Sequence, residues 1–210
     1  MEPKQLKALE RKAYRSTFAD GLWDVMLGCV VLLFALAPLL SEKLGDFWSS
    51  MIFLPFWGLV YLIIRLLRKN IVAPRLGNVT FSQERQQKIR KTTHTMLLIN
   101  VLMLIIGLIA ALSSGELASR WPLIIVSGLI MLGFSLAARM LDYPRLYFYG
   151  ILLFVAPLFG EWLYTNYGVA HHGFPLVFGA VSGLILLIGV VQFFRMLMNN
   201  PAMEAPFTGA

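Results

Sequence analysis

The sequence predicts an all-α membrane protein: a bundle of six transmembrane helices, arranged as three tandem helical hairpins, with both termini in the cytoplasm. Six long apolar stretches, an asymmetry of positive charge and an internal similarity between the stretches support this fold class. Of the 210 residues, 58% are hydrophobic and 14% are charged, whereas roughly 25% of the residues in soluble domains are charged. The composition is therefore too apolar for a soluble domain, and we expect lipid to surround most of the chain.

Each apolar stretch has close to the ~20 residues that a helix needs to cross the hydrocarbon core of a bilayer. The stretches are 21–40, 48–67, 95–112, 121–138, 146–164 and 174–197. The predicted parts of the chain are a basic amphipathic helix at the membrane surface (1–20), a first hairpin (21–67), a basic cytoplasmic connection (68–94), a second hairpin (95–138), a third hairpin (139–197) and a cytoplasmic tail (198–210).

Positive charge lies almost entirely on one side of the predicted membrane. If each stretch crosses once, all Lys and Arg residues except Lys43 and Arg120, sixteen of eighteen, fall on the side of the two termini. Cytoplasmic loops of membrane proteins carry such an excess of Lys and Arg. The sequence therefore predicts a multi-pass protein of the cell membrane with cytoplasmic termini, and we interpret the membrane as the cytoplasmic membrane of a prokaryote.

The basic residues also indicate a class of partner. They cluster at the ends of the stretches, and no nucleic-acid-binding motif accompanies them, so we expect no nucleic acid partner. Near the N-terminus, Leu6, Leu9, Ala13 and Thr17 recur at helical spacing, with basic residues on the other faces. This pattern is typical of a helix lying at the membrane surface. We therefore expect membrane lipids with anionic headgroups to be bound on the cytoplasmic side.

The apolar stretches resemble one another. The sequence Pro-Arg-Leu follows the second stretch at 74–76 and the fourth at 144–146, and Ser-Gly-Leu-Ile occurs at 127–130 and 182–185. Duplication of one helical hairpin would explain these matches. The alternative is chance, because a chain built largely from Leu, Ile, Gly and Phe matches itself easily.

Two acids at the start of the first stretch are the leading candidates for an intramembrane charge. Asp20 and Asp24 lie four residues apart, on a helical stripe that continues through Gly28, Val31 and Ala35. Small residues let helices approach closely, so this stripe is predicted to face the bundle. An intramembrane acid is a functional candidate unless a partner explains it. The structural alternative is an ion pair, for which the candidate partners on the same side of the membrane are Arg65, Arg68, Arg139 and Arg145.

A second polar cluster is predicted on the outer side, where Glu161, His171 and His172 lie close in sequence. We interpret it as a wetted outer loop, because adjacent histidines do not converge easily on one ion and no zinc-ligand pattern is present. Asn100, in the third stretch, suits a hydrogen bond between helices. Gly179 and Gly183 form a Gly-x-x-x-Gly face that indicates close helix packing, within the chain or in a homo-oligomer.

No glycine-rich phosphate loop, nucleophile elbow or metal-ligand spacing is present in the sequence. We therefore expect no catalytic residues, metal or cofactor, and we favour a non-enzymatic regulatory or accessory subunit that acts through contacts with lipid and a membrane-protein partner. One alternative is a small-solute or lipid transporter or channel, which the repeats, the helix prolines and the inward acids favour. Another is an intramembrane lipid-modifying enzyme that uses Asp20 with Asp24, or Glu161 with His171.

Overall fold

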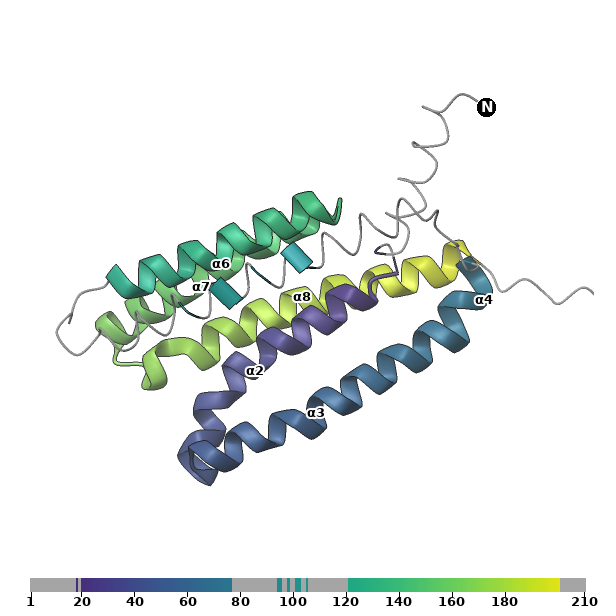
Figure 1. Ribbon diagram of the computed structural model, residues 1–210. Helices are drawn as coiled ribbons and strands as arrows, with labels where there is room; N and C mark the ends of the chain where they lie inside the picture. The colour runs from purple at the N-terminus through teal and green to yellow at the C-terminus, as the bar shows by residue number, and fades with distance from the viewer. Residues whose placement is uncertain are drawn as a thin grey trace, which may run out of the picture. The chain divides into compact units, whose positions relative to one another are not determined.

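A computed structural model describes residues 18, 20–76, 94, 95, 98, 101, 102, 105 and 121–200 (Figure 1). Within them the regular elements are α2 (Leu22–Leu44), α3 (Asp46–Leu67), the π-helical segment η1 (Arg68–Val72), α4 (Ala73–Leu76), α6 (Trp121–Met140), α7 (Arg145–Tyr167), the short 3-10 segment η2 (Ala170–Gly173) and α8 (Phe174–Asn199).

Five helical segments in this part of the chain are long and apolar enough to cross a membrane: Leu22–Leu44, Phe47–Arg75, Leu123–Met140, Arg145–Tyr167 and Ala170–Asn199. These segments make the protein an all-α, multi-span membrane protein by helix length and composition. They correspond to the first, second, fourth, fifth and sixth predicted stretches. The third, 95–112, lies mostly outside the described residues, as do nearly all of the predicted surface helix and most of the basic connection and tail.

The chain forms two compact units. Unit 1 comprises residues 1–80 and 182–210, and unit 2 comprises residues 81–181, so that α8 begins in unit 2 and continues into unit 1.

In unit 1, α2 packs antiparallel against the later part of α8 at positions where both helices have small residues. A Cβ placed on Gly28 would lie 2.7 Å from Cγ of Leu186, and one placed on Gly189 would lie 2.8 Å from the backbone nitrogen of Val25. The Ser182 hydroxyl donates a hydrogen bond of 3.0 Å to the Gly28 carbonyl across the same contact. Small residues thus allow the two backbones to approach closely.

The buried face of α2 is the stripe that the sequence predicted. Asp20 and Asp24 are 1% and 0% exposed, and Gly28, Val31 and Ala35 continue the buried face at helical spacing. The expectation that this stripe faces inward is confirmed.

At Gly45, where φ is 78°, the chain reverses from α2 into α3. This left-handed backbone angle suits glycine, which has no Cβ. Because α3 then runs back along α2, its end meets the start of α2. There the buried side chains of Leu22, Val72 and Met196 form a core cluster that joins α2, η1 and α8.

Helical structure continues past the end of α3 through Asn70 and Pro74 to Leu76. In η1 the Ala73 N–H donates to the Arg68 carbonyl, five residues back. This wider turn changes the hydrogen-bond register just before Pro74, where an α-helical register would press the proline ring against a preceding carbonyl.

In unit 2, α6 and α7 form an antiparallel pair joined by a short turn. The Tyr143 N–H donates to the Ala138 carbonyl at 3.0 Å, and Pro144 stands directly before the first residue of α7. The buried residues of α7 recur every three or four positions, which gives one inward face. Pro144-Arg145-Leu146 therefore begins a helix, whereas Pro74-Arg75-Leu76 lies within one, so the two Pro-Arg-Leu sequences have different local structures.

Candidate functional site

The candidate site lies in unit 1, where α2 begins and α3 ends. Asp20 precedes α2, and its Oδ1 accepts a hydrogen bond of 3.1 Å from the Leu22 N–H. Free N–H groups and the helix dipole favour a negative charge at this end of a helix. Gly21 lies between Asp20 and Leu22. Its φ of 73° and its close approach to the Gly189 carbonyl leave no room for a side chain. The turn therefore fixes the Asp20 carboxyl against the bundle.

Arg68, the first residue of η1, holds the other oxygen of this carboxyl. Its Nη2 donates to Oδ2 of Asp20 at 2.9 Å. The Asp20 side chain is 2% exposed and that of Arg68 is 37% exposed. The guanidinium carbon of Arg68 also lies 5.6 Å from the centroid of the Trp23 ring, within the range of a cation–π contact. Arg68 is thus bound on one side and open to solvent on the other.

The environment of Asp20 affects its protonation. Burial raises the pKa of the Asp20 carboxyl above its ordinary value, and the charge and hydrogen bond of Arg68 offset part of that rise. Asp20 lies before the apolar segment Leu22–Leu44. The carboxylate therefore depends on Arg68 to remain charged in a buried position.

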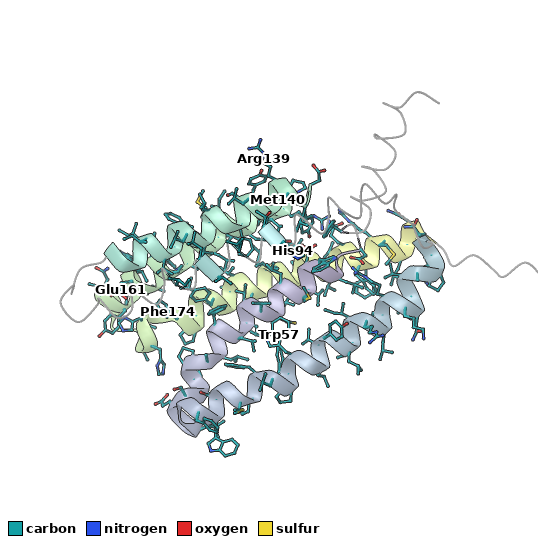
Figure 2. All side chains as sticks on the ribbon, viewed as in Figure 1. Trp57, His94, Arg139, Met140, Glu161 and Phe174 are labelled. Carbon is teal, nitrogen blue, oxygen red and sulfur yellow. The ribbon has the colours of Figure 1, made fainter. Side chains whose placement is uncertain are left out.

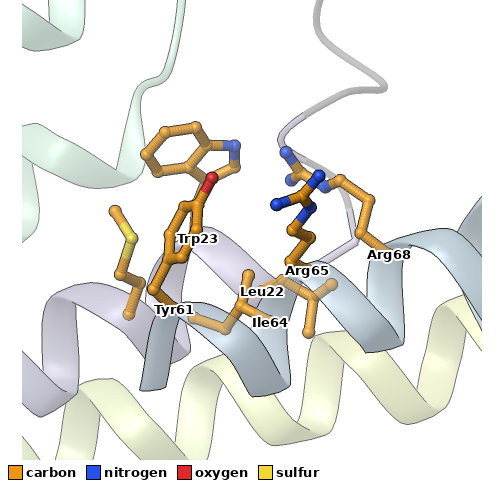
Figure 3. A pocket seen from close by; sticks show the side chains of 7 residues that line it. Leu22, Trp23, Tyr61, Ile64, Arg65 and Arg68 are labelled. Carbon is orange, nitrogen blue, oxygen red and sulfur yellow. The ribbon is translucent and has the colours of Figure 1, made fainter. Parts of the chain in front are cut away.

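A cavity of about 350 Å³ lies beside this ion pair (Figure 3). Helix α2 contributes Leu22, Trp23 and Met26 to its lining. The other lining residues are Tyr61, Ile64 and Arg65 of α3, together with Arg68. In Figure 3 the guanidinium groups of Arg65 and Arg68 extend to the same side as the Trp23 indole and the Tyr61 hydroxyl.

The polar lining of the cavity comes from one helical face. Tyr61, Arg65 and Arg68 stand at positions i, i+4 and i+7 of the continuous helix formed by α3 and η1. Within the described structure, the side chain of Arg65 makes no hydrogen bond or ion pair. None of the lining residues is acidic, so the cavity has positive charge that Asp20 balances only in part.

The remaining candidate charges are placed as follows. Asp24 is wholly buried, and its expected pairing with an arginine remains a prediction; the structure places Arg68 on Asp20, one turn earlier. Arg139 and Arg145 belong to unit 2, where Arg139 is exposed and the guanidinium of Arg145 lies 5.8 Å from the Tyr143 ring centroid.

The structure brings Glu161 and His172 of the predicted outer cluster together. His172 Nδ1 lies 2.8 Å from Oε2 of Glu161, and its ring centroid lies 4.2 Å from that of Tyr164. His171 and His172 both have positive φ, 54° and 53°, in the turn that leads to Gly173. In unit 2, Arg139 and Glu161 lie at opposite ends of the helices (Figure 2). In the described ranges, no group of three His, Cys, Asp or Glu residues is placed to hold a metal ion.

The residues predicted to pack helices together differ in how closely they are packed. Gly28 is packed closely, as described above, but Gly183 is exposed and a Cβ added there would meet no atom within 4 Å. Gly179 is half-buried, and Asn100 lies outside the described residues. The close approach on α8 is instead made by Gly189, whose role was not predicted from the sequence.

Trp23 and Tyr61 were not predicted from the sequence to form a site with Arg65. The spacing of Tyr61, Arg65 and Arg68 could have indicated a shared face, but nothing in the sequence showed that the start of α2 would close a cavity over it. No family model matches the chain, and comparison with curated proteins and with solved structures gave no significant match.

Proposed function

We propose that this protein is a non-enzymatic regulatory or accessory subunit that acts through contacts with anionic lipid and with another membrane protein. In this proposal it crosses the cytoplasmic membrane of a prokaryote six times as three hairpins, with both termini in the cytoplasm. The positive charge on that side of the predicted membrane supports this orientation.

The observation that carries the proposal is the pair of arginines at the end of α3. Asp20 fixes Arg68 in place, while the exposed side chain of Arg65 lines the cavity and makes no hydrogen bond or ion pair in the described structure. A cation at the end of a membrane-length apolar helix lies at headgroup depth, where anionic lipid attracts it. The surface of α3 is available for contact, since only 6% of its most apolar window is buried.

The lipid part of this proposal can be tested in nanodiscs. The purified protein should have a higher melting temperature in a mixture of phosphatidylcholine and phosphatidylglycerol than in phosphatidylcholine alone, and salt should reduce the difference. Equal melting temperatures in the two bilayers would contradict the lipid contact. The accessory role requires, in addition, a membrane protein that copurifies in a fixed ratio after crosslinking in native membranes.

A small-solute or lipid transporter is the second candidate, because Asp24 is wholly buried inside a span. Intramembrane acids commonly lie on proton or ion pathways. In proteoliposomes, a transporter would carry protons or solute across the bilayer and would lose this flux in Asp24→Asn. An accessory subunit would show no flux in either form.

A further inference from the structure

Two guanidinium groups and three apolar side chains line the cavity between α2 and α3, a combination that suits a ligand with one anionic and one apolar end. We propose that this cavity binds the phosphate of an anionic membrane lipid, and that the lipid's acyl chain lies along α3. The inference rests on the proposed function, whose anionic-lipid contact it assigns to one site.

The phosphate end of the site is partly preorganised. A guanidinium has five N–H donors in a planar fork that matches phosphate oxygens, and Asp20 accepts a bond from Nη2 of Arg68. The remaining donors of Arg68 and all those of Arg65 can bind a second anion. Because the contact with Asp20 already holds Arg68, less side-chain freedom is lost when the phosphate binds.

Aromatic groups mark the depth of the site. Trp23 is 37% exposed and Tyr61 is 61% exposed, and both line the cavity beside the arginines. Tryptophan and tyrosine favour the headgroup layer of membranes. A lipid phosphate lies in this layer, so the cavity is at the depth that its ligand occupies.

The acyl chain of the lipid has room along the face of α3 that contains Tyr61 and Arg65. Leu54, Gly58, Tyr61 and Arg65 follow one another at intervals of four, three and four residues, which places them on one helical stripe. A Cβ added to Gly58 would meet no atom within 4 Å, and Leu54 is 68% exposed. An acyl chain that leaves the cavity can therefore lie in the gap at Gly58 and against Leu54.

Phosphatidylglycerol with brominated acyl chains tests the site, because bromine quenches tryptophan fluorescence at short range and Trp23 lines the cavity. The full-length protein in dodecylmaltoside is titrated with brominated phosphatidylglycerol or brominated phosphatidylcholine, and Trp23→Phe identifies the signal that comes from Trp23. The variants are Arg65→Gln and Gly58→Leu. Arg195→Gln is the control: it removes the same charge from an exposed position at the end of α8.

We expect the wild-type protein to prefer phosphatidylglycerol. Arg65→Gln should weaken phosphatidylglycerol binding about tenfold, the effect of losing one charge-assisted contact, while Arg195→Gln leaves it unchanged. Gly58→Leu should weaken phosphatidylglycerol binding several-fold. Leucine also favours helix more than glycine does, so this variant should fold.

The other outcomes each reject a specific statement. If wild type prefers phosphatidylglycerol but Arg65→Gln and Arg195→Gln behave alike, the site is wrong while the proposed lipid contact survives. If wild type binds both lipids equally, the site and the lipid contact both fail. If glycerol phosphate displaces the lipid at equal concentration and Gly58→Leu has no effect, the cavity is a site for free phosphate and the lipid assignment is wrong.

Discussion

Replacing Arg68 with glutamine should destabilise the protein by an amount that depends on pH. The variant leaves the Asp20 carboxyl, whose side chain is 2% exposed, without its positive partner. Breaking a buried ion pair from one side costs about 3–5 kcal/mol. The carboxyl can instead take up a proton, which limits the loss. Protonation of an aspartate with an ordinary pKa near 3.9 costs about 4 kcal/mol at pH 7 and about 1.5 kcal/mol at pH 5.

The loss caused by Arg68→Gln should therefore be about 3–4 kcal/mol at pH 7 and should fall to about 1.5 kcal/mol or less at pH 5. Asp20→Asn should cost much less, about 0–1 kcal/mol, because burial already disfavours the charged Asp20 carboxyl and because the Arg68 side chain is 37% exposed and can return to water. The double variant should recover much of the loss at pH 7, since no buried charge remains unpaired.

Titration with SDS in mixed micelles, followed by tryptophan fluorescence, gives the free energy of unfolding of each variant at both pH values. A loss from Arg68→Gln that is equal at pH 5 and pH 7 would show that Asp20 is not the group left charged. Strict additivity of the two single variants would show that the residues do not interact in the folded protein.

Three further predictions concern matched positions. Ser182→Ala should lower the free energy of unfolding by about 1 kcal/mol, because the Ser182 hydroxyl donates to the Gly28 carbonyl. Ser127→Ala should be neutral or stabilising, because the buried Ser127 hydroxyl has no partner in the described structure. Equal losses of stability for the two variants in SDS titrations would contradict this. Gly189→Ala should lower the free energy of unfolding by about 1–3 kcal/mol through overpacking against α2. Gly183→Ala should cause no loss, because the added Cβ enters open space. A larger loss for Gly183→Ala than for Gly189→Ala would place the helix contact at Gly183. Because burial raises the pKa of Asp20, the stability of the wild-type protein should decline as pH rises from about 4 through that pKa. Asp20→Asn should lack this decline. Parallel profiles of stability against pH for the two proteins would contradict the raised pKa.

The sequence predicted the parts of the fold that depend on composition and periodicity. Hydrophobic length located the five described spans, and the helical period of Asp20, Asp24 and Gly28 located the buried face of α2. Both signals are local, because they depend on the environment that a single helix needs.

The contacts between helices were harder to predict. The sequence placed an arginine near Asp20 and Asp24, which are one helical turn apart. It did not show which of the two acids contacts Arg68, because that depends on how α2 and α3 cross and on the π-helical turn of η1. That turn has no clear sequence signature. Likewise, α8 has glycines on more than one face, and the Gly-x-x-x-Gly pattern indicated Gly183, whereas the face that contacts α2 contains Gly189.

The orientation of the spans decides whether the Asp20, Arg65 and Arg68 site faces the anionic cytoplasmic leaflet, and thiol labelling measures it most directly. In a protein with Cys29 replaced by alanine, single cysteines are introduced at the exposed positions Asn166, near the end of α7, and Asn199, at the end of α8. Intact cells are then treated with a membrane-impermeant maleimide. The cysteine at 166 should react, and the cysteine at 199 should react only after the cells are permeabilised; labelling of 199 and protection of 166 in intact cells would place the site on the outer face and contradict the proposed function.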